Sequence, residues 1–214
     1  CGNIDLVENF QHLKDMIGYV PQEDIIYENL TLRKMLHYTA RLKMPDDTGQ
    51  GEIEKRIDEI LDMIDLKEHQ NTYIRKLSGG QKKRASIAVE LLADPKLFFL
   101  DEPTSGLDPG TEKNLMLSLK RLTKEQDKTV IMVTHTTQNL HLCDKILFMG
   151  PGGRLCFAGN VEQAKQFFHK EELTDIYNLL AGNAAEWQQR FQESQSKENW
   201  QEPESAPKEP IAKK

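Results

Sequence analysis

Leu77-Ser78-Gly79-Gly80-Gln81 is the stretch that decides the fold of this 214-residue chain. Its small residues bare their backbone N–H groups at the start of an apolar-periodic segment, residues 85–92. This pattern predicts a helix whose N-terminus is offered to an anion, with phosphate the obvious candidate. We expect the helix to end near Asp94-Pro95, because the residue before a proline avoids the helical conformation.

Two apolar runs further along the chain predict strands. Leu97-Phe98-Phe99-Leu100 ends abruptly in Asp101 and Glu102, which is typical of a buried parallel strand that delivers acids to its C-terminal edge. Residues 129–133 are apolar and β-branched, which predicts a second buried strand, and Thr134-His135 follows it. Ligand groups of open α/β sheets gather at that edge, so we expect chemistry there.

Composition limits the classes of function. Charged residues make up 29% of the chain and are mixed in sign, with a formal net charge of −6, so nucleic acid is not favoured as a partner. No apolar run approaches the roughly 18 residues of a membrane span, and we expect a soluble, cytosolic chain. Cys1, Cys143 and Cys156 lack metal-ligand spacing and indicate reduced thiols.

Five motifs carry a family resemblance. Residues 77–81 are identical to the signature motif of ATP-binding cassette (ABC) ATPases, and residues 97–102 match their Walker B strand. Thr-Ser-Gly-Leu-Asp at 104–108 resembles the D-loop, His135 resembles the switch histidine, and Gln22 in Gly-Tyr-Val-Pro-Gln resembles the Q-loop glutamine. Residues 134–168 resemble the G, or pigment-transporter, subfamily and bacterial ABC-2-type exporters.

The resemblance implies an α/β fold of the P-loop NTPase type, with a mostly parallel sheet and a helical subdomain at about 28–93. Helical periodicity from Thr31 and again from Gly51 agrees with such a lobe. Only 55 residues separate Gln22 from Leu77, which favours a transporter over relatives with long coiled-coil insertions. Further on, residues 145–157 predict a hairpin, Gly159-Asn160 a turn and cap before a helix, and residues 172–193 two short helices.

One motif of the family is missing. A P-loop needs Gly-x-x-x-x-Gly-Lys-[Ser/Thr], and this sequence contains no Gly-Lys dipeptide. We therefore expect a partial cassette at 1–193, without its N-terminal strands and P-loop, which binds MgATP weakly when isolated. Residues 194–214 are charged and contain three prolines, which is typical of a linker or tail.

The resemblance also assigns catalytic and metal-binding roles, with ATP and Mg²⁺ as cofactors. Asp101 would hold Mg²⁺, which prefers oxygen ligands, and Gln22 would sense the metal or the attacking water. Glu102 would polarise that water as general base, and His135 would hydrogen-bond the γ-phosphate. Pro-Gln alone is a weak signal, so a polar turn is the alternative for Gln22.

A second group of residues would act across a dimer. In the family, the signature residues contact the γ-phosphate of nucleotide held by the opposite subunit, and the D-loop aspartate crosses the interface. The residues that match here are Ser78, Gly79, Gly80, Gln81 and Asp108. Lys82, Lys83 and Arg84 either add positive charge nearby or form a solvated face.

The sequence thus favours the ATP-hydrolysing cassette of an exporter-like ABC transporter. Its partners would be a second cassette, in a head-to-tail dimer, and a transmembrane domain that holds the chain at the cytoplasmic face of a membrane. One alternative is a soluble cassette ATPase that works on ribosomes or DNA, and another is a regulatory module that naturally lacks a P-loop. The transported substrate, its direction and the identity of the partner cassette stay open.

Overall fold

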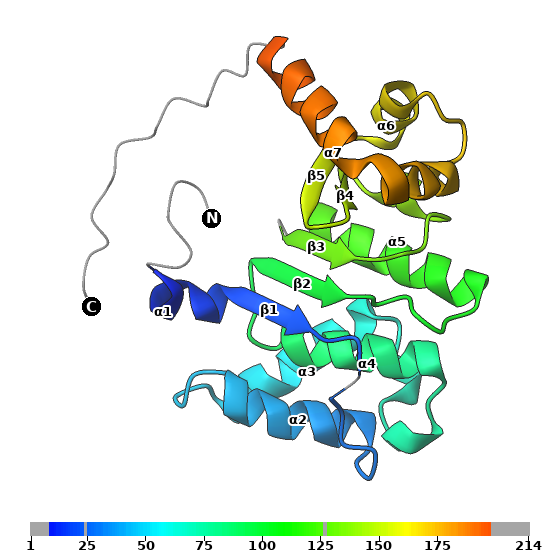
Figure 1. Ribbon diagram of the computed structural model, residues 1–214. Helices are drawn as coiled ribbons and strands as arrows, with labels where there is room; N and C mark the ends of the chain where they lie inside the picture. Colours follow the sequence, from blue (N-terminus) through cyan, green and yellow to red (C-terminus); the bar gives the residue numbers. More distant parts are fainter. Residues whose placement is uncertain (1–8, 24, 126–127, 198–214) are drawn as a thin grey trace. The chain divides into compact units, whose positions relative to one another are not determined.

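The computed structural model describes residues 9–23, 25–125 and 128–197 (Figure 1). The chain divides into two compact units. The first is Gln11–Leu142, which contains every residue predicted to act on nucleotide, and the second joins Cys1–Phe10 to Cys143–Lys214. Within the described residues, no helix combines the length and apolarity needed to cross a bilayer.

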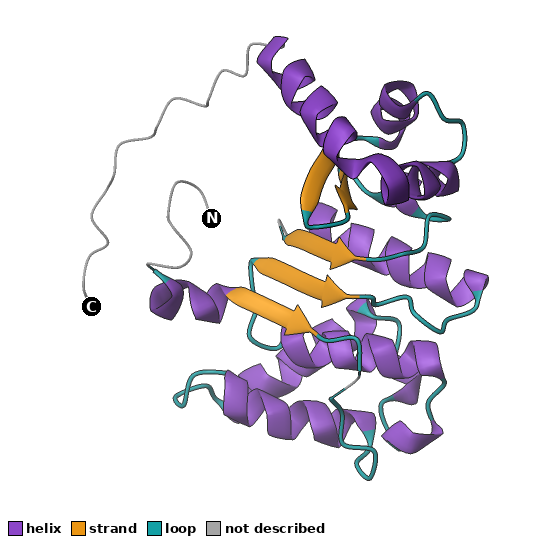
Figure 2. Ribbon diagram, in the orientation of Figure 1, coloured by secondary structure: helices purple, strands orange, loops and turns teal. Residues whose placement is uncertain are grey.

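A parallel sheet forms the centre of the first unit (Figure 2). Its strands are β1 (Ile17–Val20), β2 (Leu97–Asp101) and β3 (Thr129–Val133), in the order β1-β2-β3. Val20 pairs with Leu100 and Asp101 pairs with Val133, so the C-terminal ends of all three strands meet at one edge. The predicted α/β class with a parallel sheet is confirmed.

The two predicted buried strands differ in exposure. Phe98 and Leu100 of β2 are buried between neighbours on both sides. In β3, Ile131 is 45% exposed and Val133 is 61% exposed, because they lie on the opposite face of the sheet, the face that also carries Tyr19, which is 53% exposed. The prediction of a buried strand at 129–133 is therefore wrong for this structure, since β-branched composition reports strand preference and not whether both faces of the sheet are covered.

A helical lobe follows β1 (Figure 1) and consists chiefly of α2 (Leu32–Lys43), α3 (Gln50–Met63) and α4 (Gly79–Leu91), with short 3₁₀ turns Lys67–His69 and Ile74–Lys76. The apolar faces of α2 and α3 are buried, through Leu32, Met35, Leu36, Ala40, Ile53, Ile57, Ile60 and Leu61. Leu42, near the end of α2, is 85% exposed, because a helix two residues beyond the buried Ala40 has turned its side chain to the opposite side.

Helix α5 (Pro109–Glu125) packs against β3. Leu115, Leu119 and Leu122 are buried, whereas Leu117 is 42% exposed. The 3₁₀ turn Leu140–Leu142 closes the first unit, and the short helix α1 (Phe10–Leu13) and the turn Lys14–Met16 precede β1.

The second unit begins with an antiparallel pair, β4 (Ile146–Gly150) and β5 (Arg154–Gly159), which confirms the predicted hairpin. Asn160 caps α6 (Val161–Phe168), also as predicted. Helix α7 (Leu173–Lys197) is interrupted at Asn183, so two helical segments fill the region predicted as two short helices. α7 continues four residues into the predicted linker, and residues 198–214 lie outside the described part of the chain.

Candidate functional site

Three predicted site residues meet at the C-terminal edge of the sheet. The Gln22 side-chain amide donates to Glu102 Oε2 at 3.1 Å. His135 Nδ1 lies 3.2 Å from Glu102 Oε1. Both carboxylate oxygens of Glu102 are therefore engaged, one by the loop after β1 and the other by the loop after β3. Strand order explains this meeting, because β2 lies between β1 and β3.

The backbone of Glu102 is also constrained. Its φ of 43° lies in the left-handed region, which is uncommon for residues other than glycine and concentrates at functional sites. The Glu102 N–H donates to the Val133 carbonyl at 2.9 Å, so the strand pairing extends one residue past β2. The side chain is 26% exposed, compared with 65% for His135. A half-buried carboxylate at an open rim can be reached by water.

Asp101, the last residue of β2, lies beside Tyr19, whose hydroxyl is 3.4 Å from Asp101 Oδ2. Among the described residues, no group of three or more acidic, histidine or cysteine side chains could hold a metal. Mg²⁺ at phosphate sites needs only one or two protein carboxylates, with waters and phosphate oxygens as the other ligands. The hard oxygens of Asp101 and Gln22 fit such an ion.

The signature segment forms the N-terminus of α4. The Ser78 hydroxyl accepts from the Gln81 N–H at 3.3 Å, and the Gln81 side chain accepts from the Ser78 N–H at 2.9 Å. This capping box fixes the first turn and puts Gly79 and Gly80 at the positive end of the helix dipole. Gln81 Nε2 also lies 2.9 Å from His69 Nε2, a contact that the sequence analysis did not predict.

The D-loop residue Asp108 caps α5. Its Oδ1 accepts from the N–H groups of Gly110 and Thr111, both at 3.1 Å, and its Oδ2 accepts from the Thr111 hydroxyl at 2.6 Å. These bonds, the one from the Thr111 hydroxyl most of all, lower the pKa of Asp108. Asp108 thus acts within its own chain, and the role across a dimer interface stays a prediction.

Lys83 is a further residue that contacts the Q-loop. Its side chain is buried, and its ammonium donates to the carbonyls of Pro21 at 3.2 Å and Gln22 at 2.9 Å. The interpretation of Lys83 as part of a solvated face is wrong. Helical spacing contained the signal, because Lys83 falls three residues after Gly80 and four before Ile87, on the buried face of α4.

Comparison with known proteins agrees with this geometry. The family model described as "ABC transporter" matches residues 2–105. The chain is 38% identical over 172 residues to ABC transporter ATP-binding/permease protein Rv1747 of Mycobacterium tuberculosis, a match that covers 80% of this chain and 20% of the relative. It is 36% identical over 164 residues to the broad substrate specificity transporter ABCG2 of Mus musculus, covering 73% of this chain and 25% of the relative.

Solved structures point the same way. CbiO1 from Clostridium perfringens, part of the ABC transporter complex cbiONQ, aligns with a TM-score of 0.67 and 31% identity over 82% of this chain and 68% of its own. A dimeric, post-hydrolysis ATP-binding cassette, MJ0796 bound to ADP and Pi, aligns with a TM-score of 0.56 and 32% identity, covering 68% and 63%.

The chain belongs to the ABC transporter family. Within that family it resembles G-subfamily and bacterial transporters, as predicted from residues 134–168. The chain spans a fifth to a quarter of the length of these two curated relatives. Their similarity therefore bears on the cassette and not on a whole transporter.

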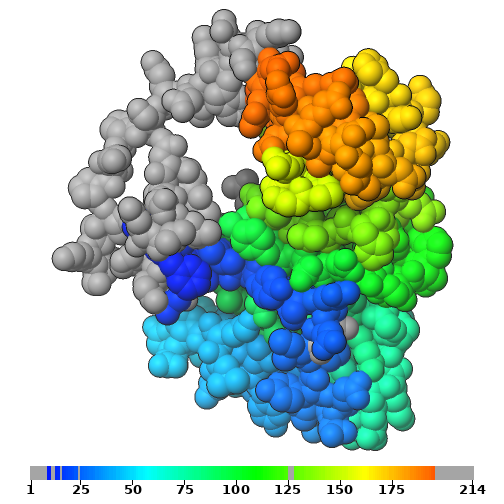
Figure 3. All heavy atoms as spheres, in the orientation of Figure 1, coloured from blue at the N-terminus to red at the C-terminus, as the bar shows by residue number. Residues whose placement is uncertain are grey.

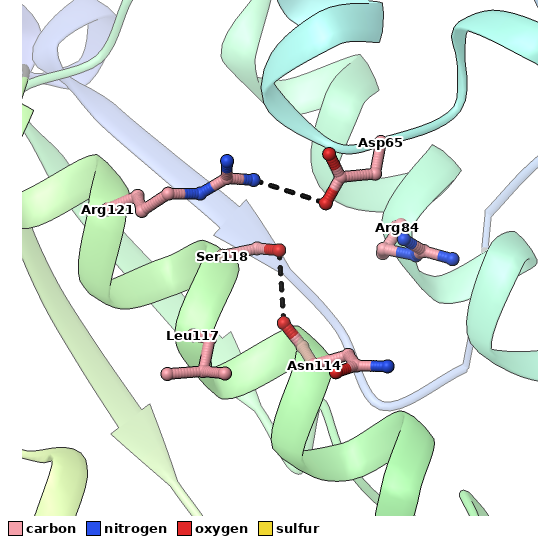
Figure 4. Close-up of a pocket in the computed structure, with 6 residues that line it drawn as sticks. All are labelled: Asp65, Arg84, Asn114, Leu117, Ser118 and Arg121. Carbon is pink, nitrogen blue, oxygen red and sulfur yellow. Dashed lines mark hydrogen bonds and ion pairs between the residues drawn. The ribbon is translucent and has the colours of Figure 1, made fainter.

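A hollow of about 430 Å³ is lined by Asp65, Arg84, Asn114, Leu117, Ser118 and Arg121 (Figure 4). Its two arginines are already used. Arg84 donates to the Ile64 carbonyl at 3.1 Å, and Arg121 donates to Asp65 at 3.1 Å. The hollow contains none of the predicted site residues, and we assign it no ligand.

Proposed function

We propose that this chain is the ATP-hydrolysing cassette of an exporter-like ABC transporter. The observation that carries the proposal is the position of Glu102, held between the Gln22 amide and the His135 imidazole at the edge of a parallel sheet. A carboxylate fixed on both sides and partly open to solvent is suited to orient a water molecule for attack on phosphate.

Each residue then has a role in hydrolysis. Glu102 takes the proton of the attacking water, and His135 hydrogen-bonds the γ-phosphate. Asp101 and the Gln22 amide oxygen would hold Mg²⁺, which would supply positive charge to neutralise the phosphate. Because phosphoryl transfer depends chiefly on positioning and electrostatics, a small error in the place of these groups is costly.

The signature residues act on a second cassette. The N-terminus of α4, with Ser78 and Gln81 fixed by their capping box, would face the γ-phosphate held by a partner cassette in a head-to-tail dimer. Support comes from the MJ0796 cassette, whose structure is dimeric. Asp108, at the exposed start of α5, would lie at the same interface.

A membrane domain is the second proposed partner. Exposed apolar side chains occur on the loop after Gln22 and on α2, namely Ile25, Tyr27, Tyr38 and Leu42. Figure 3 shows that segments of β1 and α2 reach the surface on one face. Exposed apolar side chains mark interaction sites where they gather, and both curated relatives are transporters by name. Docking there would place the chain at the cytoplasmic face of a membrane. The net charge of −6 gives no reason to propose nucleic acid as a partner.

The alternatives receive less support. A soluble cassette ATPase is less supported, because the two curated relatives, Rv1747 and ABCG2, are transporters by name. A regulatory module without a P-loop would need no water-orienting carboxylate, yet Glu102 is held on both sides.

The test is vanadate-sensitive ATPase activity of the whole protein that carries this sequence. Glu102→Gln should lower the rate by a factor of about 100 or more, as expected for loss of a general base, while nucleotide binding is kept. Glu59→Gln is the matched control, because Glu59 lies on α3, away from the predicted site residues in sequence, and its ion pairs within the described residues are with Lys55 and Arg56, at 3.7–3.8 Å. Equal rates for Glu102→Gln and the unmodified protein would refute the assignment of Glu102 as the base.

A further inference from the structure

Glu112 is a buried carboxylate to which neither the motifs nor the proposed mechanism assigns a role. It lies in the first turn of α5, where its N–H donates to the Asp108 carbonyl at 2.9 Å, and only 5% of it is exposed. A carboxylate is seldom buried to this extent unless it is paired or hydrogen-bonded. Its hydrogen-bond partners therefore indicate what it is for.

Both donors to Glu112 come from the segment just after His135. The Thr136 hydroxyl donates to Glu112 Oε1 at 3.2 Å, and the Asn139 amide donates to the same oxygen at 2.9 Å. Asn139 is itself buried. Glu112 thus accepts two hydrogen bonds from the loop that follows His135 and holds that loop against α5.

A short chain of hydrogen bonds extends this hold across His135. The Thr136 N–H donates to the Thr134 hydroxyl at 3.1 Å, which makes a tight turn with His135 at its centre. The two threonine hydroxyls lie 3.1 Å apart. Since the Thr136 hydroxyl donates its hydrogen to Glu112, the Thr134 hydroxyl must be the donor in this pair. The Thr134 hydroxyl therefore donates to the Thr136 hydroxyl, which donates to Glu112, so both neighbours of His135 are linked to this carboxylate.

We propose that Glu112 is a positioning residue, which orients His135 toward Glu102 by fixing the 134–139 turn. His135 is 65% exposed and its Nδ1 lies 3.2 Å from Glu102 Oε1, so the direction of its ring depends on the turn that carries it. This inference rests on the proposed function, because it assumes that the place of His135 matters for hydrolysis.

The test compares ATP hydrolysis by variants of the whole protein. Glu112→Ala should lower kcat by about tenfold, the effect of losing buried hydrogen bonds that hold a group in place, with little change in KM for ATP. Glu112→Gln, which keeps an acceptor oxygen, should recover most of the rate. Ser118→Ala is the matched control, because Ser118 is also a buried polar residue of α5 but donates only to the Asn114 carbonyl, at 3.0 Å.

The deciding measurement is a double-mutant cycle with His135→Ala. If Glu112 acts through His135, adding Glu112→Ala to His135→Ala causes no further loss of kcat. An equal loss in both backgrounds, or no loss in the single variant, overturns the inference. Thr136→Val removes one donor with little change of shape, and the same non-additivity is expected there if Glu112→Ala does not fold.

The failure of this inference can be separated from the failure of the proposed function. If His135→Ala and Glu102→Gln leave hydrolysis unchanged, the proposed function is wrong. If those variants lose activity while Glu112→Ala keeps it, only the positioning role is wrong.

Discussion

The close approach of α4 to α5 gives a quantitative prediction. A Cβ atom on Gly80 would lie 2.2 Å from Thr111 Cγ2, whereas one on Gly79 would meet only Leu107 Cδ2, at 4.0 Å. Thr111 cannot easily turn away, because β-branched side chains are stiff and its hydroxyl donates to Asp108 Oδ2 at 2.6 Å. Gly80→Ala should therefore strain the contact, and Gly79→Ala should not.

The expected magnitude follows from two opposing effects. Replacing glycine by alanine in a helix gains up to about 1 kcal/mol of propensity, which both variants share. Overpacking costs about 1–3 kcal/mol and applies to Gly80→Ala alone. The difference in unfolding free energy between the two variants should be about 1–3 kcal/mol, a shift of roughly 1 M in the urea midpoint.

The assay is urea unfolding followed by far-ultraviolet circular dichroism, with hydrogen exchange of α4 peptides to locate the effect. Thr111→Ser supplies the rescue. Serine keeps the hydroxyl bonded to Asp108 but lacks Cγ2, and the next atoms, Thr111 Cβ and Leu107 Cδ2, are 3.6 and 3.8 Å away. Equal stability of the two alanine variants, or no recovery in the Gly80→Ala, Thr111→Ser double variant, would refute this account of the contact.

Two further predictions concern stability. Phe168→Ala should lower the unfolding free energy of the second unit by about 3–5 kcal/mol, because Phe168 is buried against Phe148, Phe157 and Trp187. Trp187 fluorescence during urea unfolding measures this loss, and a loss below about 1 kcal/mol would contradict the packing. Arg33 hydrogen bonds are the main cause of the lowered pKa values of Glu54 and Asp58, so stability from these pairs is present above about pH 4 and lost as pH falls through the lower folded values. In Arg33→Gln, the melting temperature should fall less steeply between about pH 5 and 3 than in the unmodified protein. The same pH dependence in both proteins would argue against a contribution from these ion pairs.

Much of the fold was predictable from local sequence. The apolar run 97–100 predicts β2, and Ser78 with Gln81 marks the start of α4. Both signals depend only on residues that are close in sequence. The exposure of Val133 was not predictable, because it depends on what covers that face of the sheet.

The common sheet edge was predictable from the sequence, but the contacts at it were not. Asp101 ends β2, Glu102 follows it, and His135 comes two residues after β3, so a parallel sheet brings them to one edge. The bond from Lys83 to the Gln22 carbonyl joins residues 61 positions apart, and that from Asn139 to Glu112 joins residues 27 apart. Such contacts depend on packing between elements, which a local pattern does not contain.

The most direct measurement is the structure of the Glu102→Gln variant of the whole protein with MgATP. The account predicts the γ-phosphate beside residue 102 and His135, the metal on Asp101, and Ser78 of a second cassette closing over the same phosphate. Nucleotide bound away from the carboxyl edge of β2, or with the signature helix α4 of both cassettes remote from it, would contradict the central claim.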